Sequence, residues 1–361
     1  MRDRFVLFLG AGASAPLSVP TSLEFVPEFL KRSPEYSELW NNLASEVKSA
    51  GYGRELDLEA TMTLLDAISS EDPLGYLEEA TEPVLFLYGG SQLSTAIDRI
   101  SHSYGDRATN MSKALRNFVR ERCMRPNFQL LNQIYDPLMT DLGALSSRLG
   151  MTTSSHKRGL TYPQFDCFTT NYDLAFERYC RGLVGSQIRT GFREQSGSLE
   201  FSSNQVQETG SPYLVLPLHG SVAMLRLADG RVVRSEIYSP EFGMTSAGEQ
   251  VEGEVMIYPV LEKQRTRYPF PEMFSAFAER VREAPAVVFV GFSFRDAPIL
   301  DTLRDSSHHD QLVLVVSQSA EEVVAKRIGK TLRGELIPIS VRLGDPDPHH
   351  KFAAVRPVSK R

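Results

Sequence analysis

Four short segments of this sequence combine glycine with polar side chains, and each follows an apolar stretch. They are Gly10–Ser14, Thr169–Asp173, His219–Ser221 and Gly291–Phe294. In an open parallel sheet, ligands bind where the carboxyl ends of the strands meet, and glycine turns there bring backbone N–H groups close to phosphate. Taken together, the four segments predict a polar pocket whose base is formed by phosphate-binding turns.

The first segment has more than one interpretation. Gly10, Gly12 and Ala15 occupy the positions of a G-x-G-x-x-G/A turn after the apolar run Phe5–Leu9, as in a strand that leads into a phosphate loop. A secretory signal would need a longer apolar run, and Pro16 directly follows its would-be cleavage point. The phosphate loop fits better, although a plain tight turn explains the motif nearly as well when it is taken alone.

Strand-like and helix-like stretches alternate through the second half of the chain. Helical patterns at 171–180, 272–283 and 320–332 separate short apolar runs that are rich in β-branched and aromatic residues. Alternation of this kind is typical of an α/β fold with a Rossmann-like parallel sheet. The predicted strands are Phe5–Leu9, Phe165–Thr170, Tyr213–His219, Ala286–Phe292, Gln311–Ser317 and Leu336–Leu343.

Residues 22–150 have a different pattern. Apolar residues recur three or four positions apart, which predicts helices, and Asp57 is expected to cap one of them. We expect this block to be a large helical insertion after the first strand. The predicted domains are therefore a core of residues 1–21 and 151–361 and a helical subdomain of residues 22–150.

Two local features complete the predicted fold. Leu225–Tyr238 has the pattern of a β-hairpin with Asp229 and Gly230 at its turn. Arg280 and Arg282 belong to a basic run that we expect on the solvated surface of a helix.

Composition indicates an ordinary soluble globular protein. Of 361 residues, 42% are hydrophobic and 23% are charged, and the net charge is −6. This charge gives no general attraction to nucleic acid or anionic membranes, and no apolar run approaches the ~20 residues that span a bilayer. Cys123, Cys167 and Cys180 form no C-x-x-C pair, which indicates a reducing compartment and argues against a four-cysteine zinc site. We therefore expect a cytoplasmic protein without a metal site.

The order of the four polar segments resembles that of the sirtuin family. Sirtuins carry a Gly-Ala-Gly-x-Ser loop, then Thr-Gln-Asn-x-Asp, Leu-His-Gly and Gly-x-Ser segments. The corresponding sequences here are GAGAS (Gly10–Ser14), TTNYD (Thr169–Asp173), LHG (Leu218–Gly220) and GFS (Gly291–Ser293). Each ends a predicted strand, and the resemblance covers the start of the chain and its second half.

The resemblance implies that the ligand is NAD, used as a substrate. It implies that Asn171 orients the ribose and a water molecule, and that His219 serves as the base. By the same resemblance, Asp173 supports the nicotinamide side, while Ser14 and Ser293 hold phosphate and ribose groups. The implied NAD-binding positions are Gly10, Ala11, Gly12, Ser14, Thr170, Asp173, Gly291 and Ser293.

This chain departs from the sirtuin deacylases in several places. The deacylases carry four zinc-binding cysteines between the Leu-His-Gly and Gly-x-Ser segments, whereas no cysteine lies between His219 and Gly291. The Gln before the key Asn is Thr170, and the loop sequence Ile-Pro-x-Phe-Arg is replaced by Val19–Leu23, which lacks Phe and Arg. These departures resemble the divergent bacterial sirtuin-like domains of anti-phage defence, which destroy NAD. The expected activity is NAD+ hydrolysis without zinc, in a defence effector.

Other functions were weighed against NAD+ hydrolysis. A zinc-free sirtuin-type deacylase is disfavoured by the missing cysteines and the altered loop. A non-catalytic module that binds NAD or ADP-ribose would not need a base such as His219. A dehydrogenase would need an acidic residue about 20 residues after the loop, where this chain is already helical. The key residues also have structural alternatives, because His219 could be a buried strand-end histidine, and Asn171 and Asp173 could cap the next helix.

Apolar positions in the helical block predict assembly. Val84–Tyr88 is a dense apolar patch beside Gly89 and Gly90, of the kind that forms interfaces when exposed. By resemblance, defence sirtuins work as multi-subunit assemblies, and some join a hexameric DNA-translocase ATPase of the HerA type. We therefore expect a homo-oligomer, with a HerA-type ATPase as a further partner, and no direct binding of nucleic acid or membrane.

Overall fold

The computed structural model describes residues 4–51, 56–70, 83–155, 161–195, 197–208, 211–236, 238–239, 243–257, 266–328 and 332–344. The chain divides into two units, and each is considered separately. The first comprises Met1–Val19, Met124–Met256 and Tyr268–Arg361, and the second comprises Pro20–Cys123 and Ile257–Arg267.

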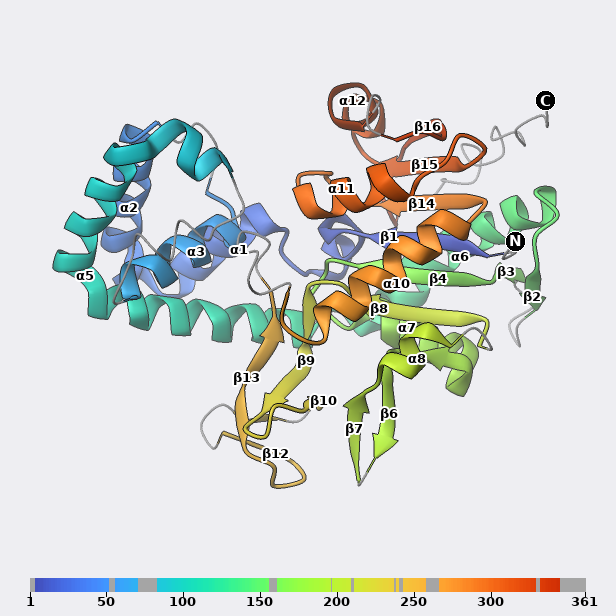
Figure 1. The fold of residues 1–361 in the computed structure, drawn as a ribbon, viewed down its shortest axis with the longest axis horizontal. Helices are drawn as coiled ribbons and strands as arrows, with labels where there is room; N and C mark the ends of the chain where they lie inside the picture. The colour runs from blue at the N-terminus through green and yellow to red at the C-terminus, as the bar shows by residue number, and fades with distance from the viewer. Residues whose placement is uncertain are drawn as a thin grey trace. The chain divides into compact units, whose positions relative to one another are not determined.

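A seven-stranded sheet is the centre of the first unit (Figure 1). Its order is β16-β15-β14-β1-β4-β8-β5, and all neighbouring strands run parallel. The prediction of a Rossmann-like parallel sheet is therefore confirmed. The strands are β1 (Phe5–Leu9), β4 (Phe165–Thr169), β5 (Ile188–Arg189), β8 (Tyr213–Pro217), β14 (Ala286–Val290), β15 (Leu312–Ser317) and β16 (Glu335–Ser340).

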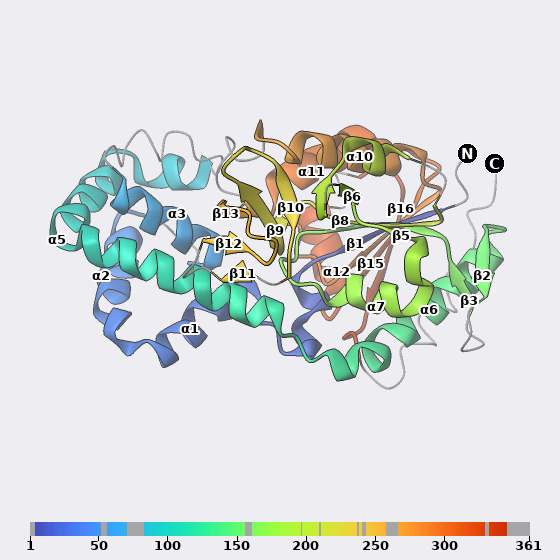
Figure 2. The ribbon, with the colours of Figure 1, turned by 90° about the horizontal axis from the view of Figure 1, so that it is seen from below.

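Helices cover both faces of this sheet. They are α6 (Leu131–Arg148), α7 (Ala175–Val184), α8 (Ser203–Gln207), α10 (Phe270–Glu283), α11 (Ala297–Ser306) and α12 (Ala320–Val323), which continues into a π-helical turn at Val324–Ile328. Figure 2 shows α10 and α11 on one side and α6 and α7 on the other. Leu7 of β1 packs in one core with Tyr135 of α6, while the ring of Phe8 lies 5.4 Å from that of Phe277 of α10. Because both faces are covered, the central strands β1 and β14 are apolar throughout and do not alternate.

A second, five-stranded sheet follows the order β13-β9-β10-β7-β6. Its central pair is the predicted hairpin, in which Val233 pairs antiparallel with Leu225 and the turn residue Gly230 has a φ of +87°. This prediction is confirmed, but the flanking strands were not predicted. The strands outside the parallel sheet are β2 (Thr153–Ser155), β3 (Thr161–Pro163), β6 (Phe192–Gln195), β7 (Ser198–Phe201), β9 (Gly220–Leu227), β10 (Val232–Arg234), β11 (Tyr238–Ser239), β12 (Met244–Thr245) and β13 (Val251–Met256).

Arg280 of α10 is buried, so the prediction that it lies on a solvated surface was wrong. Its Nε lies 3.3 Å from Oδ2 of Asp166, and its Nη2 donates to the carbonyl oxygen of Val206 at 3.2 Å. The Nη1 of Arg4 lies 3.6 Å from the other carboxylate oxygen. Burying a carboxylate without a paired cation would destabilise the folded state. The contact between Asp166 of β4 and Arg280 therefore stabilises the packing of α10 on β4. Arg282 is exposed, as expected.

The second unit is mostly helical, and its helices follow β1 in the chain, as predicted. Its helices are α1 (Ser22–Arg32), α2 (Ser37–Ser49), α3 (Leu58–Ser69) and α5 (Pro83–Met124). The predicted cap is confirmed, because the N–H of Ala60 donates to Oδ1 of Asp57 at 3.0 Å. The rings of Phe25 and Phe118 meet edge to face, which packs α1 on α5. The side chains of the predicted apolar patch Val84–Tyr88 lie outside the described residues. In the described ranges, no helix is long and apolar enough to cross a membrane.

Helix α6 belongs to the first unit. Its Leu138 and Leu142 lie in the same apolar core as Phe5 and Leu7 of β1. The sequence placed the end of the helical insertion at residue 150, whereas contacts assign this last helix to the sheet. Helical periodicity alone does not reveal which apolar surface a helix packs against.

Candidate functional site

The carboxyl ends of β14, β1, β4 and β8 lie side by side in the parallel sheet. Leu9 of β1 pairs with Val290 of β14 and with Thr169 of β4, and Thr169 pairs with Pro217 of β8. The four polar segments follow these strand ends directly. The structure therefore brings the predicted site residues to one edge of the sheet.

Backbone contacts hold the loop Gly10–Ser14. The N–H of Gly12 donates to the carbonyl oxygen of Gly291 at 3.0 Å, and the N–H groups of Ala13 and Ser14 donate to oxygens within the loop at 2.9 and 3.1 Å. The loop continues as two 3-10 turns and does not begin an α-helix. The sequence indicated a helix N-terminus at this loop, and the structure has 3-10 turns there instead.

Glycine is required here because two loops touch backbone to backbone. A Cβ on Gly12 would lie 2.9 Å from the Cα of Gly291, and a Cβ on Gly10 would lie 2.6 Å from the Cα of Phe292. Gly291 has a φ of +63°, and a Cβ on it would lie 2.3 Å from the nitrogen of Ala13. These glycines therefore serve the packing of the β1 loop on the β14 loop.

Asn171 is tied to the β1 loop through its side-chain nitrogen. Nδ2 donates to the carbonyl oxygen of Gly10 and to the hydroxyl of Ser14, both at 3.0 Å. The backbone N–H of Asn171 donates to Oγ1 of Thr169 at 2.9 Å, which fixes how the chain leaves β4. Since both side-chain N–H groups are used, Oδ1 is the atom that this half-buried side chain can offer to a ligand.

Asp173 and Ser14 form the adjoining part of the site. The N–H of Ala175 donates to Oδ1 of Asp173 at 2.9 Å, which supports the start of α7. Burial raises the pKa of the Asp173 carboxyl, and hydrogen bonds from Ala175 and Ser14 offset this rise only in part. The hydroxyl of Tyr135 donates to the carbonyl oxygen of Ala13 at 3.2 Å. We did not predict Tyr135 as a site residue, because in the sequence it is one of many apolar positions of α6. Burial, and then the charge of Asp173, raises the pKa of Tyr135.

His219 follows β8 and is almost fully buried, with 4% of the residue exposed. Its chain neighbour Leu218 donates its N–H to the carbonyl oxygen of Thr169 at 2.7 Å, which holds this segment against the end of β4. Nε2 of His219 lies 2.7 Å from Oδ2 of Asp296. Oδ1 of Asp296 caps α11 by accepting the N–H of Ile299 at 3.0 Å. We did not predict Asp296 as a site residue, and its sequence signal is an Asp followed by Ala-Pro, typical of a helix start.

The segment after β14 carries Ser293 to the surface on a tight turn. Gly291 and Phe294 both have positive φ angles, +63° and +53°. That conformation is strained for phenylalanine, and ring contacts of Phe294 with Phe289 and Phe292, each at 4.8 Å, hold it in place. Strain of this kind concentrates at functional sites. Ser293 is exposed as a result, within reach of a ligand.

The remaining predicted positions, Ala11 and Thr170, are half-buried on the same edge. The backbone N–H of Thr170 donates to the carbonyl oxygen of Leu9 at 3.2 Å, beside the β1 loop. Asn171 and Asp173 thus meet at Ser14, while His219 meets Asp296. The site therefore has two groups of contacts, one that joins the segments after β1 and β4 and one that joins the segments after β8 and β14.

The cysteines form no part of this site. All three are buried and form no disulfide bond, and burial raises the pKa of the Cys167 and Cys180 thiols. Thiols in this state are poor nucleophiles. Across the described ranges, no group of three or more His, Cys, Asp or Glu side chains is placed to hold a metal ion.

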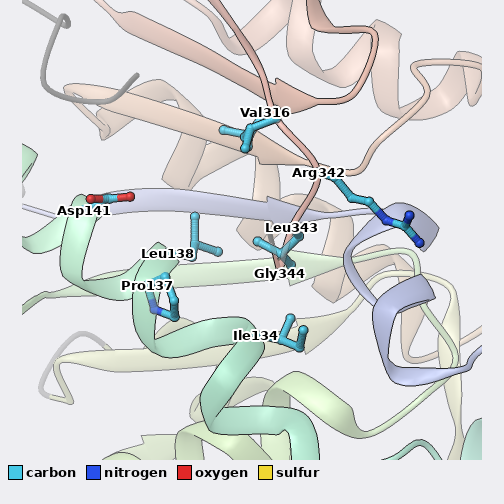
Figure 3. A pocket seen from close by; sticks show the side chains of 9 residues that line it. Ile134, Pro137, Leu138, Asp141, Val316, Arg342, Leu343 and Gly344 are labelled. Carbon is cyan, nitrogen blue, oxygen red and sulfur yellow. The ribbon is translucent and has the colours of Figure 1, made fainter. Parts of the chain in front are cut away.

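A small hollow lies elsewhere in the first unit (Figure 3). It is lined by Leu138 and Asp141 of α6, Val316 of β15 and Arg342 after β16, among others. None of the predicted site residues lines it. The candidate functional site is therefore the edge formed by the four strand ends and not this hollow.

Comparison with known families agrees with this arrangement. Residues 166–333 match the family described as the SIR2-like domain. Over this span the chain is similar to SIR2-like domains. The matched span holds Asn171, His219, Gly291 and Asp296, while the β1 loop precedes it.

Solved structures of Sir2 homologues are similar to the chain at low identity. A Sir2 homologue mutant in complex with ADP ribose shares 14% identity, with 97% of this chain and 90% of that chain covered and a TM-score of 0.38. A Sir2 homologue in complex with NAD shares 12% identity, with 97% and 88% covered and a TM-score of 0.40. No curated protein matches the chain.

Proposed function

We propose that this protein is an NAD+ glycohydrolase that cleaves the nicotinamide–ribose bond and releases nicotinamide and ADP-ribose. The observation that carries the proposal is a buried histidine beside a carboxylate, with Nε2 of His219 2.7 Å from Oδ2 of Asp296. Asn171 lies at the same sheet edge. Its side-chain nitrogen donates both of its hydrogen bonds within the protein, so its side-chain oxygen can accept a hydrogen bond from a ligand. A protein that only bound NAD would not need a base held in this way.

The polar side chains of the site can form hydrogen bonds with the ribose and phosphate groups of NAD. Oδ1 of Asn171 can accept a hydrogen bond, and the hydroxyls of Thr170 and Ser293 can both donate and accept. Asn171 and Thr170 are half-buried and Ser293 is exposed, so a substrate can reach them. Because the N–H groups of Gly12, Ala13 and Ser14 are used within the protein, hydroxyl side chains would hold the phosphates.

The chemistry follows from where charge develops. Breaking the bond between C1′ and nitrogen builds positive, oxocarbenium-like charge at C1′, as in glycoside hydrolysis. The electron pair of that bond goes to the nicotinamide nitrogen, and nicotinamide leaves as a neutral molecule. The oxygen of a water molecule bonds to C1′, and its proton passes to His219. A base in this role contributes about 10²–10⁴-fold to the rate.

One incubation tests the proposal against its alternatives. Purified protein is mixed with NAD, with and without an acetyl-lysine peptide, and free nicotinamide is measured. Nicotinamide without peptide is the result we expect. Nicotinamide only with peptide would indicate a deacylase, and NAD binding without any nicotinamide would indicate a binding module.

The biological role that we propose is anti-phage defence in the cytoplasm. Uncontrolled NAD hydrolysis would kill the cell, so the activity requires a gate. The proposed gate is self-assembly, with a HerA-type hexameric ATPase as a further partner. Family resemblance supports this part of the proposal.

A further inference from the structure

The contact between His219 and Asp296 joins two buried side chains, 5% and 8% exposed. Oδ1 of Asp296 is fixed by the N–H of Ile299 at 3.0 Å, which holds the carboxylate in one orientation. Oδ2 is buried and receives no correctly directed hydrogen bond in this conformation. At 2.7 Å, Nε2 of His219 is the group within reach that can satisfy this oxygen.

We propose that Asp296 is a positioning residue that keeps the proton of His219 on Nε2 and leaves Nδ1 as the base. This inference rests on the proposed NAD+ hydrolysis. A neutral imidazole carries one proton, and an ionised carboxylate only accepts hydrogen bonds, so the nitrogen that faces Asp296 keeps the proton. Nδ1 then carries the lone pair that takes a proton from water.

The carboxylate also acts during the proton transfer. As the water oxygen bonds to C1′ and the C1′–N bond breaks, the water proton moves to Nδ1 and the ring becomes an imidazolium. Oδ2 of Asp296 then faces a positive ring, which it stabilises. In serine proteases an aspartate holds the catalytic histidine in the same way, and changing it to asparagine lowers kcat by about 10⁴-fold because the wrong tautomer forms.

Asp296→Asn separates positioning from the structural role of the residue. Asparagine is as good an N-cap as aspartate, and its oxygen will continue to accept the N–H of Ile299. Its NH₂ group then takes the place of Oδ2 and faces Nε2. Because that group donates, the His219 proton must move to Nδ1, and the base is lost. We expect kcat to fall by about 10²–10⁴-fold with little change in KM for NAD.

A matched control makes the same chemical change at another helix cap. Asp57 caps α3 by accepting the N–H of Ala60 at 3.0 Å. Asp57→Asn is expected to leave kcat unchanged. If capping were the whole role of Asp296, both variants would keep wild-type kcat, and that result would overturn the proposal.

The tautomer is measured directly by ¹⁵N NMR of the His219 ring, on protein without NAD, at about pH 8, above the ordinary histidine pKa of about 6.5. The expected result is a proton on Nε2 in the wild type and on Nδ1 in Asp296→Asn. A wild-type proton on Nδ1, or protons on both nitrogens at this pH, would contradict the assignment of Nδ1 as the base. Absence of nicotinamide release by the wild type would instead count against NAD+ hydrolysis, and the NMR result would still decide the tautomer.

Discussion

The backbone of Gly291 occupies the space in which a side chain on Gly12 would lie. The N–H of Gly12 donates to the carbonyl oxygen of Gly291 at 3.0 Å, and a Cβ on Gly12 would lie 2.9 Å from the Cα of Gly291. The loops after β1 and β14 therefore pack as one body. A change in either loop would move both Ser14 and Ser293.

Gly12→Val is expected to lower the free energy of unfolding by about 1–3 kcal/mol, because the new side chain overlaps backbone that has no room to shift. Urea unfolding measures this change. Gly182→Ala in α7 is the matched control, since no atom lies within 4 Å of its added Cβ. That control is expected to stabilise the helix by about 0.5–1 kcal/mol. Equal unfolding midpoints for Gly12→Val and wild type would contradict the packing argument.

Arg280→Leu is expected to lower the free energy of unfolding by about 3–5 kcal/mol, because it leaves the buried carboxylate of Asp166 without its nearer cation. The 3.3 Å contact between Nε and Oδ2 is the interaction removed. Arg282→Leu, on the same helix and exposed, is the control and should shift stability by less than about 0.5 kcal/mol. Similar effects of the two substitutions in thermal unfolding would show that Arg280 contributes no more than a surface arginine.

Asp173 gives the stability a pH dependence of definite sign. Burial raises its pKa in the folded state, so the folded protein binds this proton more tightly than the unfolded chain. The stabilisation from this group is present below the unfolded pKa and is lost as the pH rises through the folded pKa. Asp173→Asn keeps an acceptor for the N–H of Ala175 and has no charge to bury. Its stability relative to wild type should therefore increase as the pH rises above the ordinary aspartate pKa of about 4. A stability difference that does not vary with pH would contradict this.

The parallel sheet could be predicted because its strands are buried on both faces. Runs such as Ala286–Val290 are apolar without interruption, and polar segments follow each one directly. The strands β6 and β13 could not be predicted in this way. At least half of the residues in their sequences, FREQ and VEGEVM, are charged, polar or glycine. The two strands form the partly exposed edges of an antiparallel sheet.

Part of the site was also beyond prediction from the sequence. Asn171 and His219 belong to segments that the sequence alone identifies. The sequence around Asp296 indicates only a helix cap, and its contact with His219 depends on the fold. The glycines were expected to accommodate phosphate, and the sequence did not indicate that they also let the β1 and β14 loops pack closely. Spacing along one chain identifies a tight turn, but it does not say what lies against it.

Assembly is a separate prediction. Light scattering of the purified chain at micromolar concentration is expected to show a homo-oligomer. A partner ATPase of the HerA type should raise the observed mass further when it is added. A monomer that hydrolyses NAD at full rate without a partner would contradict both the assembly and the proposed gate.

Nicotinamide release from NAD, measured on site variants at the concentration where the protein assembles, tests the central proposal most directly. His219→Gln and Asn171→Ala are compared with His102→Ala and Asn42→Ala, which alter exposed residues of the helical unit. We predict that the wild type and both controls release nicotinamide without any acetyl-lysine peptide, and that both site variants lose this activity while remaining folded by circular dichroism. Wild-type turnover in either folded site variant, or nicotinamide release only in the presence of the peptide, would contradict the proposed NAD+ hydrolase.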